Sequence, residues 1–241
     1  MVERQTAGAA KSVVGSQTLS RGIQILEVLA TAGAPLGIDD VAAHLGVHRS
    51  VVYRLIRTLE GHGLVQRTPG GALGLGLGLA ALAAGVEVDL RAVAIPVLRT
   101  SAQALGLTCF VALQDGDEAV TIASVEPPRA VAVVAQRPGT RHSITRGATG
   151  RVILSQLAEK DWPSELAGNS SLREQVHQVA QRGWAETSDE VIAGLHAVAV
   201  PLRLPDGRTG AVASLSVGTD QRTEVRVEVL RAAAGALMES L

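Results

Sequence analysis

Residues 36–67 read Leu36-Gly-Ile-Asp-Asp-Val-Ala-Ala-His-Leu-Gly-Val-His-Arg-Ser-Val-Val-Tyr-Arg-Leu-Ile-Arg-Thr-Leu-Glu-Gly-His-Gly-Leu-Val-Gln-Arg67. Apolar residues recur at helical spacing in two segments, one from Ile38 to Leu45 and the other from Val52 to Leu59. Gly46 lies between the segments and suits the left-handed turn that ends a helix. The stretch therefore predicts two short helices joined by a tight turn.

The outer face of the second predicted helix carries cations and hydroxyl groups but no carboxylate. Its residues are spaced as i, i+3, i+4 and i+7, and they are Ser50, Tyr53, Arg54 and Arg57. A helix that buries one side and offers guanidinium groups on the other suits the DNA major groove. The alternative is a small helical hairpin whose arginines are only solvated.

The flanking segments complete a winged helix-turn-helix. A helix precedes Gly33-Ala-Pro35, and a strand, a turn and a second strand follow from Leu64 to Leu75. Residues 1–16 are predicted as a flexible arm, 17–76 as the DNA-binding domain and 77–89 as a linker helix. The run Gly74-Leu-Gly-Leu-Gly78 lacks the strand and the Gly-Lys-Ser/Thr of nucleotide loops, which favours a flexible junction.

Residues 90–241 predict a second, α+β domain with an antiparallel sheet. A helix to about Leu105 contains Pro96, which implies a kink or a late start. The later helix that begins at Glu224 has Val225, Val229 and Leu237 on one side. The other predicted elements are strands at 108–114, 119–125, 129–136, 195–204 and 209–217, and helices at 150–157 and 172–182.

Composition narrows the function classes. The net charge is −1, but residues 1–80 hold seven Lys and Arg against five Asp and Glu, whereas residues 81–241 hold fifteen against eighteen. This asymmetry fits a DNA-binding module joined to another domain. Cys109 is the single cysteine, so no intrachain disulfide can form. Signal-peptide, membrane-span and metal-site patterns are absent from the sequence, which predicts a cytoplasmic protein without cofactor or metal.

Short motifs along nearly the whole chain resemble the IclR (isocitrate lyase regulator) family of transcription factors. They are Leu19-Ser-Arg-Gly-Ile-Gln-Ile-Leu26, Val41-Ala-Ala-His-Leu-Gly46, Ser50-Val-Val-Tyr-Arg54, Thr58-Leu-Glu-Gly-His-Gly-Leu-Val65, Gly147-Ala-Thr-Gly-Arg151, Gly183-Trp184, Gly194-Leu-His-Ala-Val-Ala-Val-Pro201 and Ala213-Ser-Leu-Ser-Val217. The resemblance implies a winged-helix domain, a helical linker used in dimerisation and a GAF-like effector-binding domain. It also implies homodimers that often pair into homotetramers.

The chain departs from the family pattern in four places. Leu73 and Gly74 stand where the wing usually carries an aromatic and a basic residue. His48 precedes the recognition helix in place of Pro or Ser. Ser188 replaces an expected ligand-facing aspartate, and Gly218 replaces the second of two ligand-facing serines, of which Ser216 matches the first.

The candidate DNA contacts divide by expected role. Base contacts are expected near the start of the recognition helix, where arginine can bond guanine in bidentate fashion. The alternative is that only phosphates are touched. Arg57 and Arg67 are expected to clamp phosphates, and Arg21 either does so or pairs with a neighbouring acid. The full set is Arg21, His48, Arg49, Ser50, Tyr53, Arg54, Arg57 and Arg67.

Candidate effector contacts centre on Gly147–Gly150, which opens a helix whose free amides would favour an anion. The family pattern adds hydroxyl, carboxylate and aliphatic groups, so the expected set is Val133, Ala148, Thr149, Ser188, Glu190, Ala197, Ser214 and Ser216. The alternative is an ordinary helix start beside exposed strand serines. His142 and His196 are expected to serve structure, with ligand contact as the alternative, and Cys109 is expected to lie in the core.

Two functions from different classes follow. The first is a ligand-responsive DNA-binding repressor or activator of a catabolic operon, which binds double-stranded operator DNA and a small organic acid, aromatic acids included. The second is a small-molecule-binding protein or enzyme with a degenerate DNA-binding module. An enzyme requires a nucleophile–base pair or a metal cluster, and the sequence shows neither pattern.

Overall fold

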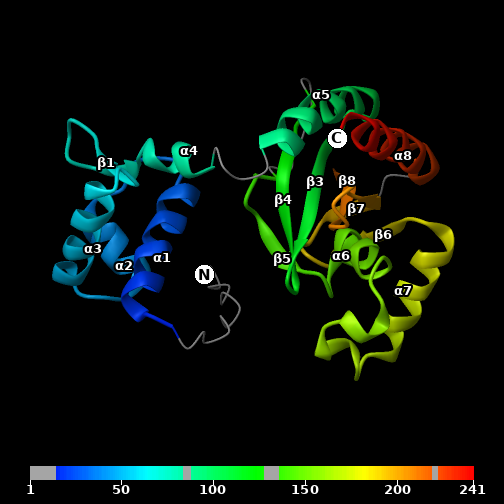
Figure 1. The fold of residues 1–241 in the computed structure, drawn as a ribbon, viewed down its shortest axis with the longest axis horizontal. Helices are drawn as coiled ribbons and strands as arrows, with labels where there is room; N and C mark the ends of the chain where they lie inside the picture. Colours follow the sequence, from blue (N-terminus) through cyan, green and yellow to red (C-terminus); the bar gives the residue numbers. More distant parts are fainter. Residues whose placement is uncertain (1–14, 84–87, 128–135, 219–221) are drawn as a thin grey trace. The chain divides into compact units, whose positions relative to one another are not determined.

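The computed structural model describes residues 15–83, 88–127, 136–218 and 222–241. The chain divides after Val86 into two compact units. Figure 1 shows a helical N-terminal unit with a short hairpin and a C-terminal unit built on a larger sheet.

The N-terminal unit is a winged helix-turn-helix, as the sequence predicts. Its elements are α1 (Gln17–Thr31), α2 (Ile38–Leu45), α3 (Arg49–Gly61), β1 (Val65–Arg67), β2 (Leu73–Leu75) and α4 (Gly78–Ala83). The core is formed by fully buried Ile25, Val41, Val52, Ile56 and Leu73, so each of the three helices and the wing contributes to it.

Local caps fix where the helices begin and end. The hydroxyl of Ser16 accepts a hydrogen bond from the amide of Leu19 at 3.3 Å, which places the start of α1. Gly46 ends α2 with φ of +64°, a left-handed conformation that glycine adopts without strain. The turn between α2 and α3 therefore forms where the sequence places it.

The glycine-rich run after the wing is a packing junction. A Cβ on Gly76 would lie 2.1 Å from the carbonyl oxygen of Gly63, and one on Gly78 would lie 2.8 Å from it. Two backbones therefore touch directly here. The predicted linker helix over 77–89 lies partly outside the described residues: α4 is described over Gly78–Ala83, and α5 begins at Val88. Within its described residues α4 buries no side chain.

The C-terminal unit is a three-layer α+β fold. Its strands are β3 (Thr108–Asp115), β4 (Glu118–Val125), β5 (Arg141–Ser143), β6 (Ala185–Ser188), β7 (Leu195–Arg203) and β8 (Thr209–Val217). The helices are α5 (Val88–Leu105), α6 (Gly147–Leu154), α7 (Ser170–Arg182) and α8 (Thr223–Ser240), with 3₁₀ turns at Glu159–Asp161 and Ser164–Leu166. The strands follow the order β5-β4-β3-β8-β7-β6, and all neighbours run antiparallel.

Helices cover both faces of this sheet (Figure 1). One face carries α5 and α8 over a core that includes Leu98, Val111 and Leu230. The other carries α6 and α7 over a core that includes Phe110 and Val152. The sheet thus separates two cores, and the side on which a strand residue points decides which one it joins.

Two helix predictions need correction. Pro96 does not delay α5, because the helix already begins at Val88 and runs past it to Leu105. On α8, Val225 is half exposed, whereas Val227, Leu230 and Leu237 are buried together with Arg226. The buried face of α8 is therefore rotated from the predicted one and includes a charged residue.

The sheet also contains two strands that the sequence pattern does not mark, β5 and β6. Both are short edge strands: β5 pairs with β4, and β6 pairs with β7. The strand predicted at 129–136 falls, except for Gln136, outside the described residues. Within the described residues, no helix has both the length and the apolarity needed to cross a membrane.

Candidate functional site

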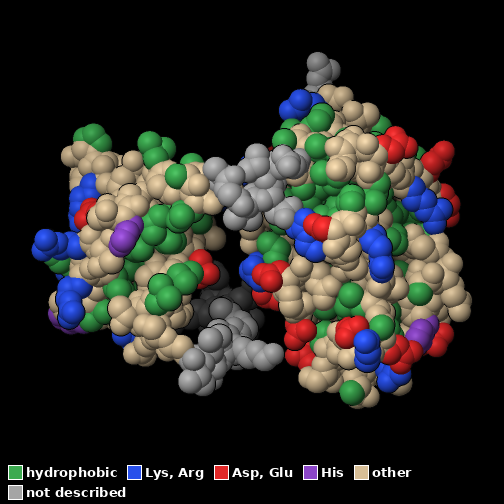
Figure 2. Space-filling view, viewed as in Figure 1, with side chains coloured by type: hydrophobic (Ala, Val, Ile, Leu, Met, Phe, Trp, Pro, Cys, Tyr) green, Lys and Arg blue, Asp and Glu red, His purple; other side chains and the backbone are tan. Residues whose placement is uncertain are grey.

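The exposed face of α3 is the candidate DNA-binding surface. Burial of Val52 and Ile56 directs Tyr53, Arg54 and Arg57 to the outside. Figure 2 shows basic side chains along the left edge of the N-terminal unit, where Figure 1 places α3. A row of cations on an exposed helix preceded by a tight turn has the form of a recognition helix.

The start of α3 is fixed by its own side chains. His48 is the N-cap: its Nδ1 accepts from the backbone amide of Ser50 at 3.3 Å and lies 2.8 Å from the Ser50 hydroxyl. Arg49 pairs with Asp39 of α2 at 3.0 Å, with both side chains largely exposed. These three predicted contact residues are therefore held in position by neighbours within the unit.

The remaining arginines differ in their partners. Within the described residues, the side chains of Arg54 and Arg57 have no hydrogen-bond or ion-pair partner. Arg67 pairs with Glu60 at 2.8 Å and donates to the carbonyl of Gly71 at 3.3 Å, which ties the wing to α3. Arg21 lies half-buried on α1. Arg54 and Arg57 are thus the cations most available to DNA.

The wing offers little to a phosphate backbone. Leu73 is fully buried in the core, and Gly74 has no side chain. A Cβ at Gly74 would meet no atom within 4 Å, so the position is open on its outer side. The wing reaches outward, but the two residues that depart from the family pattern carry no group that binds phosphate.

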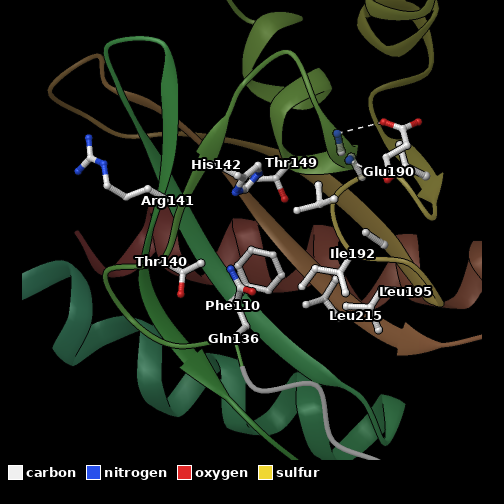
Figure 3. A pocket seen from close by; sticks show the side chains of 15 residues that line it. Phe110, Gln136, Thr140, Arg141, His142, Thr149, Glu190, Ile192, Leu195 and Leu215 are labelled. Atoms are coloured by element: carbon white, nitrogen blue, oxygen red, sulfur yellow. Dashed lines mark hydrogen bonds between the residues drawn. The ribbon is translucent and has the colours of Figure 1, made fainter. Parts of the chain in front are cut away.

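A pocket lies in the C-terminal unit on the α6 side of the sheet (Figure 3). Its volume is about 90 Å³. Most of its wall surface is apolar, although seven of the lining residues carry polar or charged side chains. The lining residues are Phe110, Gln136, Thr140, Arg141, His142, Gly147, Ala148, Thr149, Thr187, Glu190, Val191, Ile192, Leu195, Ala197 and Leu215.

Two polar groups at the pocket have no partner in the described part of the chain. Thr149 is 3% exposed, and its hydroxyl makes no hydrogen bond there. His142 also makes none, and Figure 3 shows the two side chains close together. Burial lowers the pKa of His142, the Glu118 carboxylate opposes that shift and Arg146 reinforces it. A neutral imidazole and a hydroxyl offer both donors and acceptors to a ligand.

The amides at the start of α6 are not free, contrary to the sequence prediction. The amide of Gly147 donates to Oε2 of Glu190 at 3.1 Å, and that of Ala148 donates to the Thr187 hydroxyl at 3.0 Å. Glu190 also pairs with Arg151, through contacts of 2.5 Å and 2.8 Å. The anion position of this helix is therefore filled by a carboxylate of the chain itself.

Ser214 and Ser216 do not face the pocket, which corrects the predicted placement. Both are buried on the opposite face of β8, where Arg226 of α8 donates to their hydroxyls at 3.0 Å and 3.2 Å. Strand alternation places them on one face, but that face meets α8. The residues of β7 and β8 that reach the pocket are Leu195, Ala197 and Leu215.

The other predicted effector residues divide as follows. Ala148, Thr149, Glu190 and Ala197 line the pocket. Ser188 does not, since its neighbour Thr187 points inward instead. Val133 lies outside the described residues. Residues such as Phe110, His142 and Ile192 were missed. The strand that contains Phe110 is buried at six consecutive positions, so its sequence carries no alternation that would assign Phe110 to one core.

The described residues offer the pocket neither a metal-binding cluster nor a reactive thiol. The described residues contain no group of three or more His, Cys, Asp or Glu side chains that could hold a metal ion. Cys109 is buried on the other side of the sheet, and burial raises the pKa of its thiol to about 12. A thiol with such a pKa stays protonated at neutral pH and is a poor nucleophile.

Comparison with known families covers most of the chain. The IclR helix-turn-helix domain matches residues 18–69, and the C-terminal domain of bacterial IclR transcriptional regulators matches residues 83–239. The HTH-type transcriptional regulator XynR of Escherichia coli K12 is 28% identical over 221 residues, covering 85% of this chain and 87% of that protein. The repressor AllR of the same strain is 28% identical over 228 residues, covering 88% and 84%. These relatives confirm the prediction of a regulator over an enzyme.

Solved structures show the same fold at lower sequence identity. An IclR transcriptional regulator from Alicyclobacillus acidocaldarius superposes with a TM-score of 0.76 at 23% identity, covering 94% of this chain and 99% of that one. An IclR homologue from Microbacterium hydrocarbonoxydans, complexed with 4-hydroxybenzoate, has a TM-score of 0.79 at 20% identity, covering 93% and 99%.

Proposed function

Because this chain belongs to the IclR family of bacterial transcriptional regulators, we propose that it controls a catabolic operon in response to a small organic acid. The N-terminal unit binds a palindromic operator as a homodimer, alone or paired into a tetramer. The acid binds in the pocket beside α6 and alters operator binding. An aromatic acid fits the apolar wall best.

The observation that carries the ligand proposal is the Thr149 hydroxyl. It is 3% exposed, lies on the pocket wall and has no hydrogen-bond partner in the described residues. The hydroxyl is not among the fully enclosed unpartnered atoms of the described residues, so it opens to the pocket, where a ligand that enters can complete its hydrogen bonding. The 4-hydroxybenzoate complex of a structural relative supports an aromatic acid as the ligand class.

The DNA proposal depends on the free cations of α3. Tyr53 and Arg54 are placed to reach base edges, while Arg57 is placed to meet phosphates. Arg49 pairs with Asp39 at 3.0 Å on the exposed surface and adds a further cation beside them. Two-fold symmetry of the dimer places the half-sites about one helical turn, or a multiple of it, apart.

Two measurements test this function. The first is the electrophoretic shift of DNA from upstream of the protein's own gene, with and without catabolic acids. The second is a thermal-shift screen, because an acid at a hundred times its dissociation constant stabilises the fold by about 2.7 kcal/mol. A protein that shifts no such DNA, or whose shift no acid changes, contradicts the proposal.

A matched pair of variants tests the pocket. Thr149→Val keeps the side-chain volume but removes the hydroxyl, so acid affinity falls by about 0.5–1.5 kcal/mol while stability is kept. Ser188→Ala changes an exposed neighbour that does not line the pocket. It is expected to bind the acid as the parent does. Equal affinities in all three proteins would place the ligand elsewhere.

A further inference from the structure

We propose that Glu190 acts as an internal substitute for the acid effector. Its carboxylate occupies the anion position at the start of α6, and the effector's carboxylate binds by exchanging with it. The exchange releases the segment Asp189–Gly194, called the strap below, from the pocket. This inference rests on the proposed function in one respect, that the effector is an organic acid.

The contacts of Glu190 are those of a bound carboxylate ligand. Oε2 accepts from the Gly147 amide at 3.1 Å and from Arg151 at 2.5 Å, and Oε1 accepts from Arg151 at 2.8 Å. Gly147 and Glu190 both line the pocket. A ligand carboxylate that takes this position meets the same donors, together with the unpartnered Thr149 hydroxyl in the same first turn of α6.

Arg151 stays in place when the carboxylates exchange. Its guanidinium also donates to Oε1 of Gln175 from Nε at 2.9 Å and from NH2 at 2.7 Å, so a second element holds it. Its side chain is 10% exposed, whereas that of Glu190 is 33% exposed. A buried cation requires an anion beside it. During the exchange, Arg151 always has one carboxylate beside it. The carboxylate that leaves is that of Glu190, which is the more exposed member of the present pair and returns to water.

The strap covers the pocket without being built into the core. Val191 and Ile192 line the pocket although they are 45% and 54% exposed. A Cβ on Gly147 would lie 2.8 Å from Cγ2 of Val191, so the strap rests directly on the start of α6. Because half of each apolar side chain is already in water, little apolar burial opposes movement of the strap.

The strap is closed on itself at its base. The amide of Gly194 donates to Oδ1 of Asp189 at 2.6 Å, and the Asp189 amide donates to the carbonyl of Leu195 at 2.9 Å. Asp189 has φ of +61°, a left-handed conformation that non-glycine residues seldom adopt. These bonds keep the strap together as a unit. At its base the Gly194 carbonyl also accepts from the Gly218 amide at 2.9 Å. Glu190 joins the strap to α6 through its side chain, and its carbonyl accepts from Arg146, the residue before α6.

The size of the pocket also requires movement. The cavity of about 90 Å³ is smaller than the roughly 150 Å³ of an apolar cavity that takes benzene. An aromatic acid therefore enters only if part of the wall moves away. The strap is the part of the wall with the most exposed apolar side chains, and release of Glu190 frees it.

The test uses the full-length protein with acetate and benzoate as probes. Glu190→Ala leaves Arg151 without its carboxylate, so acetate is expected to raise the melting temperature of this variant and to leave that of the parent almost unchanged. Glu190→Gln keeps the volume and removes the charge. Calorimetry is expected to show that this variant binds benzoate at least tenfold more tightly than the parent. It also provides the test if the alanine variant fails to fold.

Glu159→Ala is the matched control. Glu159 pairs with Arg173 at 2.7 Å on the exposed surface, outside the pocket lining. This variant also loses a carboxylate from an arginine, but it should respond to acetate and benzoate as the parent does. An equal response in the Glu159 and Glu190 variants, or no response in either, overturns the exchange.

Amide hydrogen exchange with solvent tells whether the strap is released from the ligand-bound pocket or closes over it. Benzoate bound to the parent is expected to speed amide exchange across Asp189–Gly194, whereas a lid that closes on the ligand would slow it and overturn the inference. The rise in melting temperature with acetate reports only binding at the start of α6. If it appears while no acid changes operator binding, the proposed effector function fails and the exchange stands. If an acid changes operator binding but binds the parent and Glu190→Gln with equal affinity, the proposed effector function stands and the exchange fails.

Discussion

Arg226 donates from its guanidinium to Nδ1 of His196 at 2.6 Å, with no exposed surface of its own. Because arginine has only donors, Nδ1 of His196 is the acceptor and the ring proton lies on Nε2. That nitrogen is 2.5 Å from Oε1 of Glu186. Arg226 and His196 thus orient a buried polar cluster between β7, β8 and α8, on the face of the sheet away from the pocket.

Ser214→Ala is expected to weaken the fold and to leave ligand binding unchanged. The Ser214 hydroxyl accepts from Arg226, so its loss leaves a buried guanidinium short of an acceptor and lowers the free energy of unfolding by about 1–3 kcal/mol. Urea denaturation measures the stability, and calorimetry with the acid measures binding. Loss of acid affinity at normal stability would return Ser214 to the effector site.

Arg54→Ala is expected to cost about 1–3 kcal/mol of operator binding and to relax the preference at one base position. The reason is that Arg54 is exposed on α3 and has no partner in the described residues. Footprinting on a set of operator variants measures both effects. Arg67→Ala is the control, because its guanidinium is bound to Glu60 and Gly71 and should affect all sequences alike.

Gly74→Arg is expected to add a phosphate contact at the wing. The position has open space around a Cβ, so the fold should accept the side chain. One added contact steepens the slope of log K against log salt by about 0.9. An unchanged slope would mean that the wing does not approach DNA. Gly76→Arg is the contrasting variant, and it should unfold the wing because its Cβ would collide with the Gly63 carbonyl.

Acidification is expected to destabilise the C-terminal unit through His142. Burial lowers the pKa of His142 in the folded protein, so the unfolded chain binds the proton more readily. Stability is therefore complete above the unfolded pKa of about 6.5 and falls as pH drops below it, by at most about 1.4 kcal/mol per pH unit. His142→Asn should flatten that part of the pH profile in thermal unfolding. A profile that stays equally steep would assign the loss to other groups.

The sequence alone predicts the architecture because periodicity and turn residues report local geometry. Ile38 to Leu59 identifies the helix-turn-helix, and the predicted strands at 108–114 and 119–125 identify the start of the sheet. Short edge strands such as β5 lack a pattern long enough to detect. Their position follows from pairing with β4, which is a long-range contact that no local window contains.

The effector site was predictable only in part, for a related reason. Alternation along β8 shows that Ser214 and Ser216 share a face, but it does not say which layer covers that face. That choice depends on α8, and a buried arginine on α8 contradicts the usual preference of charged residues for water. Likewise, the start of α6 marks an anion position, but only the fold shows that Glu190 already fills it.

Burial of Arg226 also bears on how the chain is made. A ribosome releases β7 and β8 before α8, so the new hairpin first shows Ser214, Ser216 and His196 to its surroundings without the guanidinium that satisfies them. The nascent sheet is therefore incomplete on one side until the last helix emerges and docks. Synthesis halted between β8 and α8 leaves an unfinished domain with a polar gap and an uncovered apolar face, which is the kind of surface that chaperones and proteases recognise.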